Sequence, residues 1–492
     1  MTRRTAGRYA SDHDYVQRVR RHHPSSLLPL LARAGAEAPP VSDPDRREDG
    51  RAGFYGPWAV LDVAWMSLAW GSELWGVPAA RADVDDILWM FHDLEDPQLQ
   101  LPVELMAGFL LRMGGQQFGW QEPDFPAASR PVALLQDTTP SRPGRLKVIT
   151  PGWDRELFGC SLTEYVSAAQ LVSAVARTSG KGRFDPQGLP GRLPGFTELT
   201  TPQALAAVVE ANFATTARAV RDLAGAERRG ADLPDPELRR FGFNPLRAHP
   251  VLSGFGDGYL VPSPAAVLAK ASAYGIYYSG IGKFGPAFAD DLGDLFEQYV
   301  GRHLRLVEGA EVHPEVSYRT GRDAVLSVDW IVVLKDLVLL VEVKSARPTA
   351  ALNLGPADWS KEVTGKLAKA VVQLERTAAR IKEGHPDFAH IPADRPVLGM
   401  VVTMEPYHHI NSPGLRTALP RAPFPVTVAS ANELEEAVTV PNLGELLLAG
   451  ARSPGDWSIR RSLGDRRIPE NPILAEAWEQ LPLTKAAVLR GR

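Results

Sequence analysis

The chain has 492 residues, a formal net charge of -4 and one cysteine, Cys160. Its length favours two or three domains, and its 44% hydrophobic and 23% charged residues are typical of folded proteins. A single cysteine excludes an intramolecular disulfide and a cysteine-based zinc cage within one chain. The near-neutral charge excludes a uniformly basic surface, so any nucleic-acid contact must come from a local patch. No apolar stretch reaches the about 20 residues of a membrane span, and we expect a cytoplasmic protein with no membrane contact.

The first half of the chain predicts an arm followed by a helical domain. Residues 1–52 are rich in Arg, His, Pro and Asp without sustained periodicity, which is typical of a flexible basic arm. Residues 53–245 are predicted to form a mainly α-helical domain of unassigned role. Six tryptophans expected to contribute to its core crowd its first half: Trp58, Trp65, Trp70, Trp75, Trp89 and Trp120.

Two helices in this domain have clear boundary signals. Ser161 and Glu164 form a capping box, which predicts a helix from Leu162 to about Arg177. Thr201 and Pro202 begin a second predicted helix that ends near Gly225, because Pro favours the first helical position and Gly the end.

The remaining segments outside the chemistry-bearing region are a connector and a tail. Residues 246–284 contain Gly256-Asp257-Gly258, which predicts a small hairpin in a connector, and residues 446–492 are expected to be a C-terminal tail. No glycine-lysine pair has the spacing of a phosphate-binding P-loop. His408 and His409 have no third ligand at metal-binding spacing, and a loop location is favoured.

Residues 285–445 contain the pattern that carries chemistry. Apolar residues between Phe288 and Val307 recur at helical spacing, and Glu297 borders that stripe. Counting this helix, the predicted order of elements is α-β-β-β-α-β. One more strand then precedes a capping box at Ser430 and Glu433. The predicted strands and helix after the first helix are Val312–Tyr318, Ala324–Val333, Leu337–Lys344, Trp359–Lys382 (the helix), Val397–Met404 and Pro425–Ala429.

The strongest prediction concerns a hairpin turning at Lys335 and Asp336. With a turn centred there, paired residues have numbers that sum to 671, so Asp329 opposes Glu342. Directly opposed residues share a face with Cβ atoms about 4.5–5.5 Å apart, and Lys344 joins them on that face. Two neighbouring carboxylates among Val, Leu and Ile are unfavourable unless a cation neutralises them. Hard oxygen ligands suit Mg²⁺ or Mn²⁺, and Lys344 would face the phosphate.

Gly293-Asp-Leu-Phe-Glu297, Val328-Asp329-Trp330, Val341-Glu342-Val343-Lys344 and Gln373 together resemble the PD-(D/E)XK nuclease superfamily. The resemblance covers about residues 285–440. It implies a restriction-endonuclease-like α/β domain with a mixed sheet, preceded by the helical domain. It further implies that Asp329, Glu342 and the carbonyl of Val343 bind metal, that Lys344 is catalytic, that Glu297 assists and that Gln373 is the family's helix glutamine.

Two departures from the family pattern are visible. Val328 stands where the name motif has Pro, and Thr377 stands where the RecB-like branch has Tyr. The alternative interpretation is a surface-facing acid pair on an edge hairpin, with Lys344 in a cross-strand ion pair. Glu297 and Gln373 could equally be solvated residues at the edge of a helical stripe.

The predicted function is a Mg²⁺-dependent endonuclease acting on DNA, with a restriction or anti-phage role by analogy. The helical domain would choose the substrate, sense a signal or dock a partner, and an NTPase or sensor protein is a plausible partner. The helix after the hairpin could contact nucleic acid, although a solvated face is the simpler explanation, through Lys366, Lys369, Arg376 and Arg380. The alternative function is a non-catalytic nucleic-acid-binding or scaffold protein that retains the nuclease fold.

Overall fold

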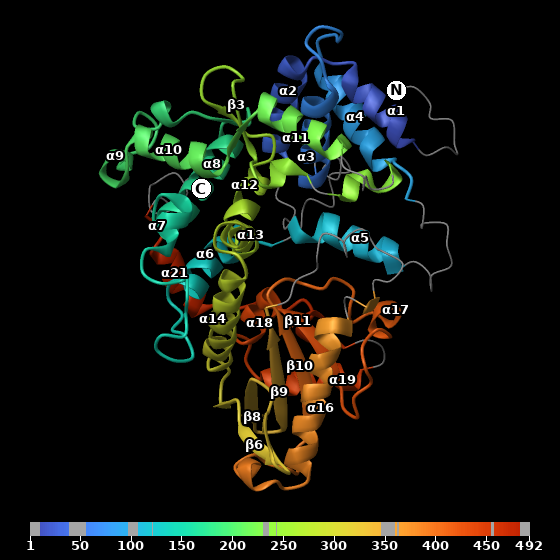
Figure 1. Cartoon of the computed structure of the whole chain (residues 1–492), viewed down its shortest axis with the longest axis vertical. Helices are drawn as coiled ribbons and strands as arrows, with labels where there is room; N and C mark the ends of the chain where they lie inside the picture. The colour runs from blue at the N-terminus through green and yellow to red at the C-terminus, as the bar shows by residue number, and fades with distance from the viewer. Residues whose placement is uncertain are drawn as a thin grey trace.

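The chain is a mixed α/β protein whose upper part in Figure 1 is helical and whose lower part contains the large sheet. The computed structural model describes residues 10–38, 56–96, 107–120, 122–229, 236–242, 244–345, 360–361, 364–453 and 457–482. Helix α5 (Ala107–Gln117) lies between the helical part and the sheet (Figure 1). No helix in the described ranges is long and apolar enough to cross a membrane.

The first helices pack into a hydrophobic core, together with residues from later in the chain, instead of forming a flexible arm. They are α1 (Asp12–Arg20), α2 (Pro24–Glu37), α3 (Pro57–Trp70) and α4 (Arg81–His92). Ser11 caps α1 through the backbone N–H of Asp14, and Tyr15 and Leu31 are fully buried in the cluster that α3 completes. The expected arm is therefore wrong for residues 12–37, because both helices bury apolar stripes. Residues 1–9 and 39–55 lie outside the described residues.

The tryptophan-rich region only partly forms the expected core. Trp65 and Trp120 are buried, whereas Trp75 is 87% exposed and Trp89 is 44% exposed. Trp75 lies in the turn between α3 and α4, so its position in the sequence did not indicate whether an apolar partner would cover it.

The middle of the chain confirms one predicted helix and corrects another. Its helices are α6 (Asp124–Leu135), α7 (Trp153–Phe158), α8 (Leu162–Thr178), α9 (Phe196–Leu199), α10 (Pro202–Asn212) and α11 (Ala217–Arg229). Ser161 and Glu164 form the predicted capping box of α8. The helix that starts after Thr201 ends at Asn212 and not near Gly225, because the next residues form strand β2 (Ala214–Thr216), which pairs with β3.

Two strands and two helices occupy the predicted connector, and the strands join β1 and β2 from the predicted helical domain in a small sheet. The sheet has the order β1 (Arg183–Phe184), β4 (Tyr259–Leu260), β3 (Val251–Ser253) and β2. Strands β3 and β4 are antiparallel on either side of Gly256-Asp257-Gly258, which confirms the hairpin. Helices α12 (Pro264–Ala271) and α13 (Ala273–Phe284) follow and lead into α14.

The large sheet is mixed, as expected. It has the order β11 (Val426–Ser430), β10 (Val397–Thr403), β9 (Leu337–Lys344), β8 (Trp330–Leu334) and β5 (Glu311–Pro314). The strands β9, β10 and β11 are parallel, while β8 and β5 run antiparallel to their neighbours. Helix α14 (Pro286–Leu304) precedes the sheet and α16 (Lys369–Lys382) lies between β9 and β10 in sequence.

Three predicted elements are divided in the structure. The strand expected over 324–333 is split into β7 (Asp323–Leu326) and β8, and β7 pairs with β6 (Ser317–Thr320) in a separate two-stranded sheet. The strand expected over 312–318 is likewise divided between β5 and β6. Helix α16 begins at Lys369, after a π-helical turn over Thr364–Ala368. Residue Trp359 lies outside the described residues.

The two faces of the sheet belong to different hydrophobic clusters. Val341 and Val343 pack with α14 and with α6–α8, whereas Val338 and Leu340 pack against α16. The first cluster continues across the boundary expected near residue 285. It also contains residues of the predicted tail, because α21 packs against α6. The later helices are α17 (Pro413–Arg416), α18 (Ala431–Ala437), α19 (Leu443–Arg452), α20 (Ile459–Leu463) and α21 (Pro472–Glu479).

Candidate active site

The hairpin has the predicted register. Trp330 pairs with Val341 and Leu334 with Leu337, so paired numbers sum to 671 and the turn residues are Lys335 and Asp336. Asp329 directly precedes β8, and the backbone N–H of Val343 donates to its Oδ2 at 2.6 Å. This bond joins the start of β8 to the end of β9 and places Asp329 beside Glu342.

The acid pair is not on an edge strand facing solvent. Strand β9 is the central strand of the sheet, and Glu342 is 0% exposed. Lys344 donates to Oε1 of Glu342 and keeps 31% of its side chain exposed. The ion pair of the alternative interpretation is therefore present, but it runs along one strand. It leaves Oε2 of Glu342 buried without a hydrogen-bond partner among the described residues.

The pKa values of these two acids are raised mainly by burial. Burial, followed by the charge of Asp329, raises the pKa of Glu342 to about 8 even though Lys344 opposes the shift. Burial also raises the pKa of Asp329, against the Val343 N–H and Lys344. Lys344 thus provides too little positive charge for the carboxylates around it, and a further cation would stabilise their ionised forms.

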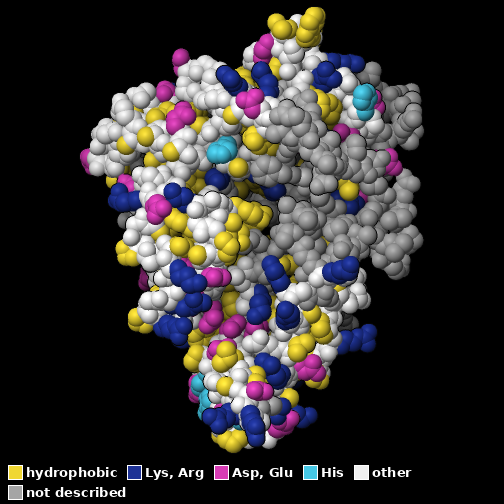
Figure 2. Space-filling view, in the orientation of Figure 1, with side chains coloured by type: hydrophobic (Ala, Val, Ile, Leu, Met, Phe, Trp, Pro, Cys, Tyr) yellow, Lys and Arg dark blue, Asp and Glu magenta, His cyan; other side chains and the backbone are white. Residues whose placement is uncertain are grey.

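Two more acids face this pair from other elements. Glu297 is half-buried on α14, and burial with the charge of Asp329 raises its pKa to about 7. Glu315, between β5 and β6, is exposed, and partial desolvation with the charge of Asp329 raises its pKa as well. The sequence did not single out Glu315, because no periodicity relates it to the hairpin. Figure 2 shows acidic side chains bordered by basic ones on the visible face of the lower part, where Figure 1 draws α14 and the sheet.

Helix α14 carries two acids with different surroundings, Asp291 and Glu297. Asp291, fully buried, accepts hydrogen bonds from the backbone N–H groups of Lys147, Val148 and Ile149. Six residues later Glu297 is on the side of the hairpin, where its backbone carbonyl accepts from the indole of Trp330 at 3.0 Å. The helix is therefore fixed at both positions, which holds Glu297 at the end of the sheet.

Helix α16 holds the segment immediately before Asp329. Gln373 Nε2 donates to the carbonyl of Ser327 at 2.6 Å, and the backbone N–H of Val328 donates to Thr377 Oγ1 at 3.1 Å. Thr377 is fully buried. Gln373 is thus a positioning residue in this structure, and Thr377, the departure from the family pattern, shares that task.

The four basic residues of the predicted nucleic-acid face divide into two pairs. Arg376 donates to the carbonyl of Leu326 at 3.0 Å, and Arg380 pairs with Glu383 at 2.6 Å. These two are engaged within the protein. Lys366 and Lys369 are exposed and have no ion pair in the described part of the chain, so they remain the candidates for phosphate contacts.

The residues present suit a hard divalent cation. Among the described residues no group of three or more His, Cys, Asp and Glu side chains is arranged to hold a metal ion, but Mg²⁺ commonly takes only one or two protein carboxylates and completes its shell with water and phosphate. The unpartnered Oε2 of Glu342, next to Asp329, is the atom that such a cation would satisfy. Asp329, Glu342 and the carbonyl of Val343 are the donors that would hold it.

Comparisons with known proteins add no relative. No protein-family model, no curated protein and no solved structure matches the chain.

Proposed function

We propose that the chain is a Mg²⁺- or Mn²⁺-dependent nuclease of the restriction-endonuclease-like class, acting on DNA. One observation carries the proposal: a fully buried glutamate with an unpartnered oxygen stands beside an aspartate and a lysine at the carboxyl end of the central strand. A buried acid of this kind costs stability unless it binds something, and such sites are typical of function. The sequence of elements from α14 through the hairpin to α16 and β10 supports the class.

Each side chain has a task that its environment allows. Lys344 reaches the solvent edge, where its Nζ can donate to a non-bridging phosphate oxygen and stabilise the charge that develops there. Glu297, with its pKa raised to about 7, can accept a proton from an attacking water near neutral pH. Gln373 and Thr377 fix the backbone before Asp329. A bound divalent cation would supply Lewis-acid stabilisation and lower the pKa of a water ligand.

A cleavage assay on the full chain tests the proposal. Plasmid, linear duplex, single-stranded DNA and RNA are incubated with Mg²⁺, Mn²⁺ or EDTA, using the wild type and Lys344→Met. Lys335→Met is the matched control, because Lys335 is an exposed lysine at the turn of the same hairpin. We expect metal-dependent cleavage by the wild type and the control, and its loss in Lys344→Met.

No cleavage of any substrate by the wild type, or equal cleavage by Lys344→Met, would reject the enzymatic proposal. The same result together with DNA binding would favour a scaffold that retains the nuclease fold.

A further inference from the structure

The helical part contains a polar cleft that the carboxylate site does not use. Its empty space amounts to about 450 Å³ when the open solvent at its mouth is included. Helix α3 contributes Trp58 and Asp62, and α5 contributes Arg112 and Gln116. Further lining residues are Trp120, Arg240, Phe241, Gly242, Asn244 and Arg247. The cleft therefore combines cationic and aromatic side chains from separate parts of the chain.

The charges inside the cleft do not cancel. Arg112 is paired with Asp96, and Asp62 is paired with Arg239 at 3.1 Å while accepting from the hydroxyl of Tyr15. The first pair is neutral, whereas Arg239 also pairs with Asp12 at 2.8 Å, so the group of Asp12, Asp62 and Arg239 carries one negative charge. Arg240 and Arg247 remain, and neither forms an ion pair with any described residue. Burial lowers the pKa of Arg240 although the charges of Asp96 and Asp62 oppose the shift, so these carboxylates do not compensate for the desolvation of the guanidinium.

Two donors in the cleft are unused. Arg240 donates through Nη1 to the carbonyl of Leu94 at 3.0 Å, but its Nε is buried with no hydrogen-bond partner among the described residues. The indole Nε1 of Trp58 is also buried with no hydrogen-bond partner among the described residues. Buried donors are nearly always satisfied in native proteins, so two in one cleft indicate a missing acceptor.

Aromatic rings stand next to these cations. The guanidinium of Arg240 lies 4.7 Å from the ring centroid of Phe241, and that of Arg247 lies 5.2 Å from Trp120. Trp120 is fixed by its indole N–H, which donates to the carbonyl of Gln116 at 2.8 Å. A ligand that offers a phosphate to the guanidinium groups and a flat ring to Trp58 or Trp120 would use both kinds of group.

We propose that this cleft is a nucleotide-binding site, in which Arg240 and Arg247 bind the phosphate and the tryptophans contact the base. Helix α5 gives the site a connection to the sheet. Arg112 and Gln116 line the cleft, whereas Leu110 and Leu111 of the same helix pack against the α16 face of the sheet. Gly114 lies against His408 in the loop after β10, where an added Cβ would come within 2.8 Å of the histidine Cβ.

Calorimetric titration of the full chain in EDTA tests this proposal, because EDTA removes the cation through which the carboxylates would bind phosphate. The probes are the four ribonucleoside 5′-monophosphates, their triphosphates, the matching nucleosides, inorganic phosphate and a five-nucleotide single-stranded DNA. We expect at least one nucleotide to bind at least about tenfold more tightly than its nucleoside or phosphate. Arg247→Ala should weaken that binding about ten- to hundredfold.

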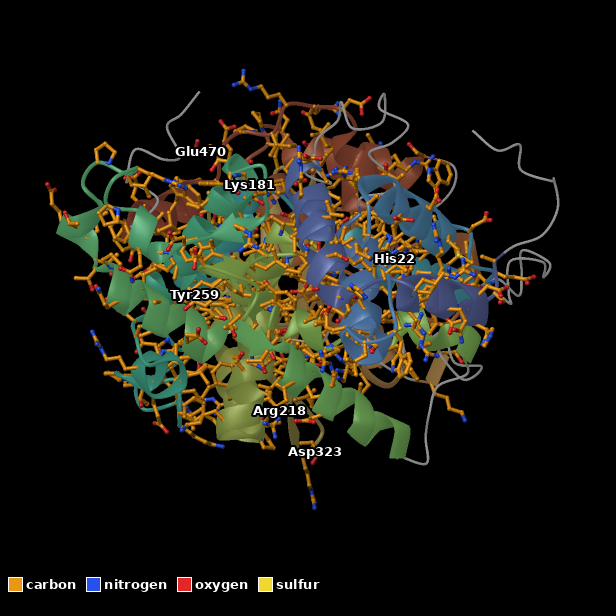
Figure 3. All side chains as sticks on the ribbon, turned by 90° about the horizontal axis from the view of Figure 1, so that it is seen from above. His22, Lys181, Arg218, Tyr259, Asp323 and Glu470 are labelled. Atoms are coloured by element: carbon orange, nitrogen blue, oxygen red, sulfur yellow. The ribbon has the colours of Figure 1, made fainter. Side chains whose placement is uncertain are left out.

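Arg218→Ala is the matched control, since Arg218 is a 92% exposed arginine on the outer helix α11 (Figure 3). It should bind nucleotide like the wild type. The melting temperature of Arg247→Ala shows whether the variant is folded, and Arg247→Lys should retain part of the affinity. Absence of binding by every nucleotide, or undiminished binding by a folded Arg247→Ala, overturns the proposal. Binding of the DNA pentamer alone overturns it too, because it would assign the cleft to a polynucleotide strand.

Discussion

Two buried ionic clusters in this molecule have opposite character. At one, Arg130 is paired with Glu435 at 2.6 Å and with Glu122, and the hydroxyl of Tyr299 donates to Glu435 at 2.7 Å. At the other, Glu342 is buried and, among the described residues, has Lys344 as its one side-chain partner and one oxygen unsatisfied.

The difference separates structural from functional charge. The Arg130 cluster joins α6, α14 and α18, and each of its buried charges has an opposite charge beside it. The Glu342 cluster has several acids around one lysine. A saturated buried network stabilises one arrangement of elements, whereas an unsaturated one is an unfavourable feature that a bound cation would relieve.

The largest effect is expected for Glu342→Gln. The amide keeps the shape but removes a metal-binding charge, so cleavage should slow at least about a thousandfold, equivalent to about 4 kcal/mol. The free energy of unfolding should stay the same or rise, because an unfavourable buried charge is gone. Cleavage rates and urea unfolding check both outcomes. Unchanged activity, or a loss of several kcal/mol in stability, would place Glu342 with the structural network.

Glu435→Ala should show the reverse behaviour. It leaves Arg130 with fewer anions in a buried position, and the free energy of unfolding should fall by about 3–5 kcal/mol. Glu436→Ala is the matched control, because the adjacent Glu436 pairs with the exposed Arg460 and such pairs contribute about 0–1 kcal/mol. Cleavage per folded molecule should not change in either variant. A small stability effect of Glu435→Ala would remove the contrast between the clusters.

Acid should weaken the structural cluster through His303. Burial lowers the pKa of this fully buried histidine to about 3, so the unfolded chain binds a proton below about pH 6.5 that the folded chain does not. The contribution of the neutral His303 ring to the free energy of unfolding is fully present above pH 6.5, and it is lost as the pH falls from 6.5 toward 3. Between pH 6.5 and 5 the wild type should lose about 2 kcal/mol more than His303→Gln.

The control for that comparison is His13→Gln, since His13 is exposed on α1. Its unfolding free energy should follow the wild type across the same pH range. Parallel pH curves for the wild type and His303→Gln would show that His303 is accessible to protons in the folded state.

The smallest effect concerns the support of Asp329. Thr377→Val keeps the side-chain shape but removes the acceptor for the Val328 N–H. The free energy of unfolding should therefore fall by about 1 kcal/mol, and the activation free energy of cleavage should rise by about 1 kcal/mol. Thr377→Ser keeps the hydroxyl and should recover most of the cleavage rate. If Thr377→Val lowers stability without slowing cleavage, Thr377 does not position Asp329.

Sequence patterns predicted local features well and long-range contacts poorly. The register of Asp329 and Glu342 followed from alternation and a two-residue turn, and the start of α8 followed from one capping box. The break at Ser327 was not visible, because the hydrogen bonds that stabilise it come from Gln373 and Thr377 on α16.

Composition misled where tertiary partners decide the outcome. The arginine-rich composition of the start did not indicate that Leu27, Leu28 and Leu31 form an apolar stripe. These residues pack against α3, which is far from them in sequence. Glu315 joins the acids only through the path of the chain between β5 and β6. The polar cleft in the helical part likewise brings together residues near 60, 115 and 245, and no local sequence pattern relates them.

Binding of Mn²⁺, followed by electron paramagnetic resonance, tests the central claim most directly. Titrations of the wild type and of Glu342→Gln at pH 8 would measure whether the buried acids hold a divalent ion without any substrate. We predict that the wild type binds Mn²⁺ at least about tenfold more tightly than Glu342→Gln. Equal binding by both proteins, or none by the wild type, would contradict the account.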